Sequence, residues 1–240
     1  MNDTVYMLPG TMCTDAIWQL VTPHLTTQVN WQLVTLPNES SFEQMTRALA
    51  ERLPKKDITL VGFSLGGYLA AYFAKTYANK CRKLCIISNS PCQLNSEELT
   101  LRKQALAWLD KFNYQGISST KATQLLDEEI SNQYDLNKLI NIIQDMDSQL
   151  GEETLKKQLR ATTHREDLSN TLNALKGTGH FIYSANDPLV NTLWLDNLFA
   201  NNPHLTRKIY SGSSHMLPLQ RPKELAKQLN SWVLGNRLEQ

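Results

Sequence analysis

The chain has 240 residues, of which 24 are Lys or Arg and 23 are Asp or Glu, giving a formal net charge of +1. This length allows one large domain with a sizeable buried core. The charges are balanced and form no block of one sign, so the chain lacks the basic excess that is usual in nucleic-acid-binding proteins. No apolar run approaches the roughly 20 residues that span a membrane.

The start of the sequence and its cysteines indicate a cytoplasmic protein. The first ten residues lack the basic segment and the long apolar core of a signal peptide. Cys13, Cys81, Cys85 and Cys92 do not form two Cys-x-x-Cys pairs, and a disulfide framework is not expected at this size without export. We therefore expect free thiols, with Cys13 as a small packing residue; a place at the mouth of the active site is the alternative for Cys13.

Short β-type runs alternate with helical patterns, which is typical of an α/β fold with a mostly parallel sheet of about six strands. Ser41 with Gln44 forms a capping-box helix start, and Pro222 and Gly235 are typical of the first position and the end of a helix. The expected strands cover residues 5–8, 32–36, 58–63, 84–88, 180–184 and 207–210, and the expected helices cover residues 14–25, 41–53, 65–77, 191–200 and 222–234.

The segment Gly62-Phe63-Ser64-Leu65-Gly66 lies between the third expected strand and a helical pattern. This is the layout of a nucleophile elbow, in which a sharp turn exposes the serine hydroxyl above the sheet. Strand and helix then approach so closely that only small residues fit two places before and two places after the serine. An ordinary Gly/Ser turn is the alternative, but the flanking strand and helix favour the elbow.

Residues 94–176 contain no convincing strand and carry Leu, Ile and Met at three- and four-residue spacings. We expect this segment to form a helical lid over the active site, inserted into a core of residues 1–93 and 177–240. A separate helical domain is the alternative. The strand pattern that resumes after the segment with the same character favours the lid.

Asp187 and His215 follow the fifth and sixth expected strands, at the carboxyl edge of the sheet where such sites form. A serine hydroxyl needs a base within hydrogen-bond reach, and that base needs an orienting carboxylate. The chain order Ser64, Asp187, His215 is the one that accompanies this elbow, so we expect these residues to form a catalytic triad. The alternatives are an Asx turn at Asp187 before Pro188 and a structural role for the histidine; Asp196, inside the next helix, should point away.

Attack on a carbonyl produces an oxyanion, which needs hydrogen-bond donors already in place. The amide of Leu65, at the start of the elbow helix, is one candidate. The second is expected from the loop after the first strand, where Gly10 permits close backbone approach. The amide of Thr11 is the preferred donor and that of Met12 the reserve, and a simple Pro-Gly turn is the alternative for this loop.

These motifs together resemble the α/β-hydrolase superfamily over essentially the whole chain. Within it the chain is similar to small cytoplasmic carboxylesterases, and Ser90-Pro91-Cys92 is similar to a segment of the pimeloyl-[acyl-carrier protein] methyl ester esterases. The resemblance implies helices on both faces and a sheet order of 4-3-5-6-7-8 in the family's numbering. The chain starts almost inside its first expected strand, so we expect the first two strands of the family's full fold to be absent. Two departures concern the substrate pocket: Pro9-Gly10 replaces the frequent His-Gly, and Pro37-Asn38-Glu39-Ser40 replaces a Gly-rich loop.

The sequence thus predicts a serine hydrolase that cleaves a small-molecule carboxylic ester or thioester through an acyl-enzyme on Ser64. One alternative is a C–C bond hydrolase or lyase with the same triad, for which Arg160 and Arg165 could bind an anion. Another is a non-catalytic binding protein on this scaffold. An acyl-carrier protein is a further candidate partner, and the basic residues that would meet it are Lys156, Lys157, Arg160 and Arg165. Without a metal-binding motif, a dinucleotide motif or a phosphate loop, we expect no cofactor and no metal.

Overall fold

The structure, a computed structural model, describes residues 3–127, 129 and 135–235. Its centre is one sheet in which all neighbouring strands are parallel, in the order β2-β1-β3-β4-β5-β6. This confirms the α/β prediction and the strand order that the family resemblance implied. The strands are β1 (Thr4–Leu8), β2 (Asn30–Leu33), β3 (Ile58–Phe63), β4 (Cys81–Ile87), β5 (Thr178–Ser184) and β6 (Thr206–Tyr210).

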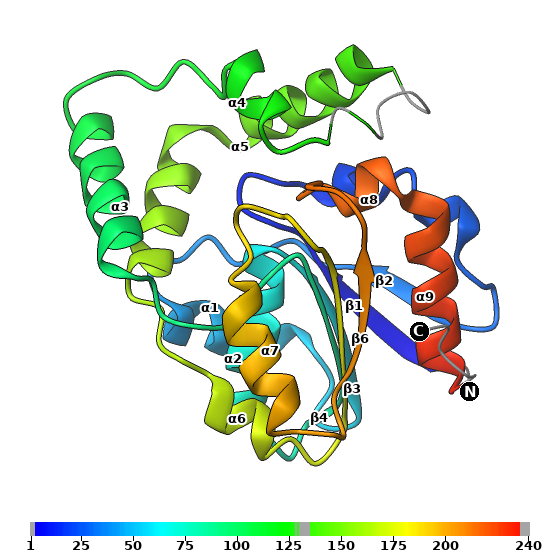
Figure 1. The fold of residues 1–240 in the computed structure, drawn as a ribbon. Helices are drawn as coiled ribbons and strands as arrows, with labels where there is room; N and C mark the ends of the chain where they lie inside the picture. The colour runs from blue at the N-terminus through cyan, green and yellow to red at the C-terminus, as the bar shows by residue number, and fades with distance from the viewer. Residues whose placement is uncertain (1–2, 128, 130–134, 236–240) are drawn as a thin grey trace.

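Helices cover both faces of the sheet, as Figure 1 shows. One face carries α1, α2, α6 and α7, and the other carries α9 with the short 3-10 helices η1 and η2. Each layer encloses its own buried apolar cluster. The helices are η1 (Asp15–Trp18), η2 (Thr22–His24), α1 (Phe42–Arg52), α2 (Leu65–Thr76), α3 (Ser96–Leu109), α4 (Ser119–Thr123), α5 (Leu136–Thr163), α6 (Ser169–Asn173), α7 (Thr192–Ala200), α8 (Leu217–Gln220) and α9 (Pro222–Leu234).

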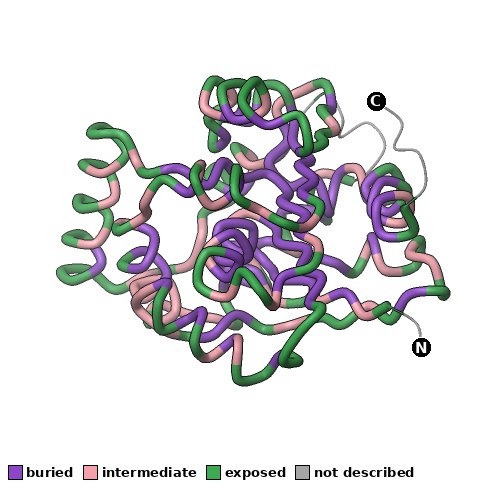
Figure 2. Tube along the Cα trace, turned by 90° about the horizontal axis from the view of Figure 1, so that it is seen from below, coloured by how far each residue is buried: buried purple, intermediate pink, exposed green. Residues whose placement is uncertain are grey.

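Three of the four helices described between β4 and β5, namely α3, α4 and α5, lie above the carboxyl ends of the strands (Figure 1). We call them the inserted helices. In α3 only Leu109 is buried, and Figure 2 shows α3 as a largely exposed helix at the edge of the molecule. Helix α5 is interrupted at Gly151, whose φ of 71° departs from helical geometry. The expected lid also includes residues 128 and 130–134, which lie outside the described residues.

Two expected elements are wrong in detail. The single helix expected over residues 14–25 is replaced by η1 and η2, because Pro23 has no amide hydrogen to donate to the carbonyl of Gln19, as a continuous α-helix would require. Strand β2 ends at Leu33 rather than at residue 36, since its partner β1 pairs with it only as far as Met7. Within the described residues, no helix combines the length and the apolar character needed to cross a bilayer.

Candidate active site

Ser64 occupies the turn between β3 and α2 in a strained conformation, with φ 50° and ψ −117°. Non-glycine residues rarely adopt positive φ, and such strain persists only where the surroundings enforce it. Here the Ser64 amide donates to the Ile87 carbonyl at 2.8 Å, and the Ser64 carbonyl accepts from the Gly67 amide at 2.9 Å. Neighbouring strand and helix therefore both hold the serine in the turn.

The glycines two places before and two places after Ser64 lie in backbone-to-backbone contact. A Cβ atom on Gly62 would lie 2.2 Å from the Gly66 carbonyl oxygen, and a Cβ on Gly66 would lie 2.4 Å from the Pro9 carbonyl oxygen. Both separations are far below any normal contact. This confirms the steric part of the elbow prediction and shows that the loop after β1 packs directly on the elbow.

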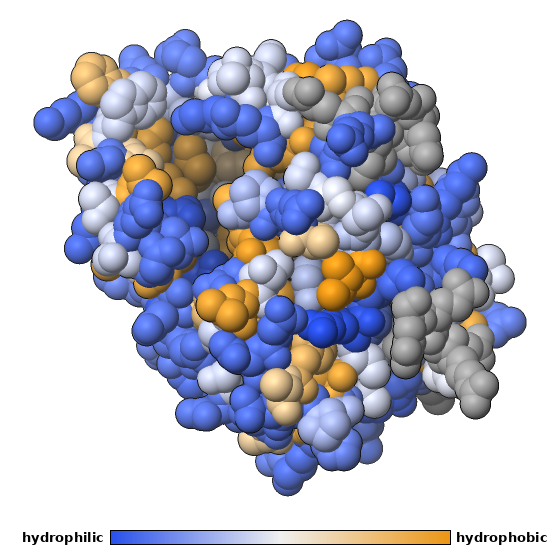
Figure 3. Space-filling view, viewed as in Figure 1, coloured by the Kyte–Doolittle hydropathy of each residue, from blue (hydrophilic) through white to orange (hydrophobic). Residues whose placement is uncertain are grey.

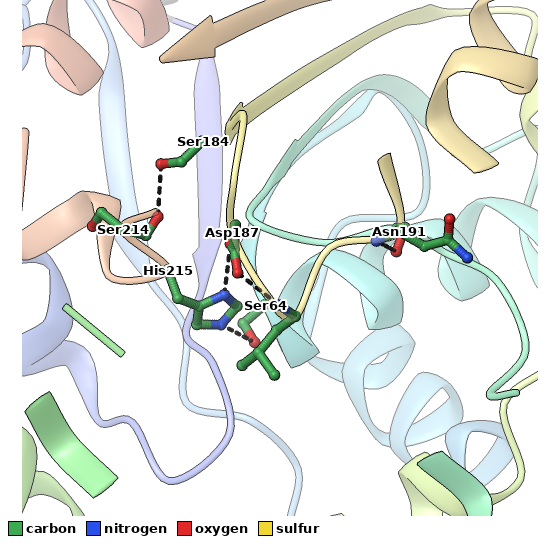
Figure 4. A network of polar contacts seen from close by, with 8 residues as sticks. Ser64, Ser184, Asp187, Asn191, Ser214 and His215 are labelled. Carbon is green, nitrogen blue, oxygen red and sulfur yellow. Dashed lines mark hydrogen bonds and ion pairs between the residues drawn. The ribbon is translucent and has the colours of Figure 1, made fainter. Parts of the chain in front are cut away.

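The structure brings the three residues of the expected triad into one hydrogen-bonded line. His215 Nε2 lies 3.0 Å from Ser64 Oγ, and His215 Nδ1 lies 2.8 Å from Asp187 Oδ2, as the dashed lines in Figure 4 show. Asp187 is only 3% exposed and His215 only 4%, and the second carboxylate oxygen accepts from the Leu189 amide at 2.9 Å. If Nδ1 donates its proton to the carboxylate, Nε2 is the acceptor for the serine hydroxyl.

The loop that carries His215 is anchored by the segment after α4. The amides of His215 and Met216 both donate to the Leu125 carbonyl, at 3.1 and 3.3 Å. The Ser213 amide donates to Asp127 Oδ2 at 2.6 Å. Sequence reasoning did not identify Leu125 or Asp127, because no local motif marks an anchor some 90 residues away in the chain.

The candidate oxyanion donors differ in their hydrogen bonding. Met12 has φ 51°, and its amide donates to Gln158 Oε1 of α5 at 2.9 Å in a buried bond. Within the described part of the chain, the amides of Thr11 and Leu65 donate no hydrogen bond. A Cβ on Gly10 would lie 3.1 Å from Ser64 Cβ, so this loop lies against Ser64. The geometry therefore favours the Thr11 and Leu65 amides over that of Met12.

Replacing Gln158 with leucine should lower kcat about 10- to 100-fold with little change in KM. The Met12 amide would lose its buried acceptor, and a displaced oxyanion loop weakens interactions that form mainly in the transition state. Gln158→Glu keeps an acceptor oxygen and should retain more activity, whereas Glu153→Gln on the exposed side of α5 should change nothing. Steady-state kinetics of the variants check this, and equal kcat for Gln158→Leu and Glu153→Gln would contradict it.

Ser64 and His215 line a cavity of about 620 Å³ beneath the inserted helices. Figure 3 shows a hollow beside these helices, with apolar side chains at its floor. Such a mostly apolar cavity with a few polar groups is typical of a small-molecule site. The apolar lining includes Met12, Leu94, Trp108, Leu109, Leu155, Leu159, Leu189 and Met216, and the charged lining comprises Glu98, Arg102, Lys121, Asp147 and Arg165.

Cys13 also lines the cavity, but its thiol is not activated as a nucleophile. Its residue is buried, and burial raises the pKa of the thiol to about 12, so it stays protonated at neutral pH. All four cysteines are free, as expected. Among the described residues, no group of three or more His, Cys, Asp or Glu is placed to hold a metal ion.

The other residues considered from the sequence lie elsewhere. Asp196 forms an exposed ion pair with Arg207 at 2.6 Å. His180 is buried, its Nδ1 lies 2.8 Å from Thr206 Oγ1, and burial lowers its pKa to about 4, so the ring is neutral and structural.

Of the four basic residues of the expected lid, Lys156 and Arg160 lie close together beside Asp110, and Lys157 donates to the Asn38 carbonyl at 3.1 Å. Lys156 Nζ lies 2.7 Å from Glu152 Oε1, and Arg160 Nη2 lies 3.9 Å from Asp110 Oδ1. Arg165 instead lines the cavity. Their positive charge is thus partly neutralised and partly directed inward.

Comparison with known proteins agrees with this architecture. A protein-family model described as alpha/beta hydrolase fold matches residues 30–222. Among solved structures, a thermophilic esterase from Thermogutta terrifontis has a TM-score of 0.82 at 17% identity, covering 98% of this chain and 90% of that one. The enol-lactonase from Burkholderia xenovorans LB400 has a TM-score of 0.79 at 12% identity, covering 98% and 92%. At these identities the likeness shows the fold alone.

Curated relatives share sequence over part of the chain. The chain is 33% identical over 107 residues to the pimeloyl-[acyl-carrier protein] methyl ester esterase of Wigglesworthia glossinidia brevipalpis, covering 41% of this chain and 40% of that protein. It is 32% identical over 93 residues to the protein of the same name from Vibrio vulnificus (strain YJ016), covering 35% and 36%. The matches thus span two fifths or less of these relatives' length.

Proposed function

Because this chain belongs to the α/β-hydrolase fold family, we propose that it is a serine hydrolase that cleaves a carboxylic ester or thioester through an acyl-enzyme on Ser64. The observation that carries the proposal is the line of hydrogen bonds from Asp187 through His215 to Ser64 at a largely apolar cavity. The curated esterase relatives support hydrolase activity independently of this geometry.

The reaction begins with attack of Ser64 Oγ on the acyl carbon, while His215 Nε2 takes the hydroxyl proton. Asp187 stabilises the resulting imidazolium, and the amides of Thr11 and Leu65 stabilise the oxyanion of the tetrahedral intermediate. Collapse breaks the bond to the leaving group, which receives the proton from His215. A water molecule, deprotonated by His215, then attacks the acyl-enzyme and releases the acid with Ser64 restored.

The inserted helices act in this proposal as a lid that shapes the cavity and limits access of water. A small-molecule ester fits the lid better than an acyl-carrier protein. An acidic carrier protein would have to bind the basic residues of the lid. Lys156 and Arg160, however, are already paired with Glu152 and Asp110 of the same chain. A non-catalytic binding protein has least support, because it would not need the strained serine or its histidine partner.

Labelling with a fluorophosphonate tests the proposal directly. The folded protein should form one covalent adduct, on the Ser64 peptide, and Ser64→Ala should form none. Ser88 serves as an internal control, since it lines the same cavity but its buried hydroxyl has no hydrogen-bond partner in the part of the chain that the structure describes. Mass spectrometry of the digest, with turnover of p-nitrophenyl esters of varied chain length, reads out the result. Absence of the Ser64 adduct on folded protein rejects the proposal, whereas labelling with inertness toward every ester favours C–C bond cleavage by the same triad.

A further inference from the structure

Two arginines from different parts of the chain line the cavity that contains Ser64 and His215. Arg102 lies on α3, and Arg165 lies in the connection between α5 and α6. A smaller cavity of about 200 Å³ shares Glu98 and Arg165 with the larger one. The arginines thus mark a polar end of an otherwise mostly apolar space.

Arg165 is fixed in place by its surroundings. Its Nη2 donates to the Ser90 carbonyl, and its guanidinium carbon lies 4.6 Å from the centre of the Tyr68 ring. Its Nε atom is buried and has no hydrogen-bond partner among the described residues. A guanidinium held by stacking and one backbone acceptor retains donors for a further group.

The two arginines share one neighbouring acid, Glu98, whose charge raises the pKa of each. Neither forms an ion pair with any acid among the described residues. Glu98, which precedes Arg102 by one helical turn, uses its Oε2 to accept from the Asn95 amide at 2.8 Å in the capping box of α3. Burial and then the positive charge of Arg165 lower the pKa of Arg102, while the charge of Glu98 opposes them.

We propose that Arg102 and Arg165 bind a carboxylate of the substrate, so that the preferred ester is a monoester of a dicarboxylic acid with an apolar chain between its two ends. Unpaired guanidiniums in a partly desolvated cavity are costly, and an anionic ligand removes that cost. Arginine is also the side chain whose planar fork matches a carboxylate. The leucines along the cavity suit the methylene chain, while the reacting ester lies at Ser64.

This inference rests on the proposed ester hydrolysis at Ser64, and it excludes an acyl-carrier thioester as the preferred group at the arginines. A thioester is neutral and would leave both guanidiniums without an ion-pair partner. A free carboxylate at the same position would not.

The test compares two substrates with the same six-carbon diacid chain, methyl hydrogen adipate and dimethyl adipate, which differ by one methyl group and one charge, with rates expressed per ester group. The wild-type protein should favour the monoester by about tenfold or more in kcat/KM, the fold-change expected of a charge-assisted hydrogen bond. Arg102→Gln should reduce that preference to within about twofold, chiefly by raising KM for the monoester, and should lower hydrolysis of dimethyl adipate by a smaller factor than that of the monoester. Arg102 is the better site for substitution because Arg165 also supports Ser90 and Tyr68.

Lys103→Gln is the matched control, because it removes one positive charge from the same helix at an exposed residue outside the cavity lining. The preference should survive this change. Equal rates for both esters in the wild-type protein, or equal loss of preference in the two variants, would overturn the carboxylate site. Failure to hydrolyse either ester, together with no fluorophosphonate adduct, would instead reject the proposed function itself.

Discussion

Asp187→Asn should lower the kcat of ester hydrolysis by about four orders of magnitude while the protein remains folded. The carboxylate lies 2.8 Å from His215 Nδ1 and is almost completely buried, so no water can replace it. An asparagine amide can present its NH2 group to Nδ1, which would move the ring proton to Nε2. The ring could then no longer accept the Ser64 proton.

Asp196→Asn is the control for this prediction. Asp196 lies in α7, nine residues after Asp187, and its carboxylate forms an exposed ion pair with Arg207. Such surface pairs contribute little to stability. Turnover of that variant should stay within about twofold of wild type. Circular dichroism should show both variants folded, and comparable kcat for the two would remove Asp187 from the catalytic machinery.

The parts of the site that sequence could predict are those set by local backbone geometry. A sharp glycine–serine turn between a buried strand and a helix requires residues without a side chain two places before and two places after the serine. The distances at Gly62 and Gly66, which leave no room for a Cβ, agree with this requirement. Asp187 and His215 follow successive strands of a parallel sheet, so their carboxyl-edge positions converge. The structure places both beside Ser64.

The parts that sequence could not predict depend on contacts between distant segments. The choice between Thr11 and Met12 stayed open because the acceptor for Met12, Gln158, lies 146 residues away. Likewise, nothing near residues 125–127 signals that they hold the His215 loop. Periodicity assigns a residue to a helix face, but it does not say which loop that face will meet.

The arginines illustrate the same limit. From the sequence, Arg160 and Arg165 were equivalent basic residues five positions apart in one polar segment. In the structure Arg160 faces Asp110 at the surface, whereas Arg165 follows the end of α5 and turns into the cavity over Tyr68. The position at which α5 ends, rather than the local amino-acid composition, determines which of the two arginines lines the cavity.

Gly66→Ala should destabilise the protein by more than about 4 kcal/mol, an effect large enough to prevent folding of an ordinary domain. The added Cβ would lie 2.4 Å from the Pro9 carbonyl oxygen and 2.6 Å from that of Leu8. Both are backbone atoms, so no side-chain rotation can relieve the contact. Relief requires separating β1 and its loop from α2, which breaks the centre of the sheet. Urea unfolding followed by fluorescence, or loss of soluble protein, would measure the effect.

Gly67→Ala separates this steric effect from the general consequences of replacing a helical glycine. Its Cβ would lie 3.0 Å from the Gly62 carbonyl oxygen and 3.1 Å from Ile86 Cγ2, distances that a shift of a few tenths of an ångström relieves. Alanine also gains up to about 1 kcal/mol over glycine inside a helix. The Gly67 variant should therefore fold with a loss of about 1–2 kcal/mol or less. Equal stability of the two variants would mean that α2 can move away from β1, and the strained geometry at Ser64 would then no longer follow from the packing of its glycines.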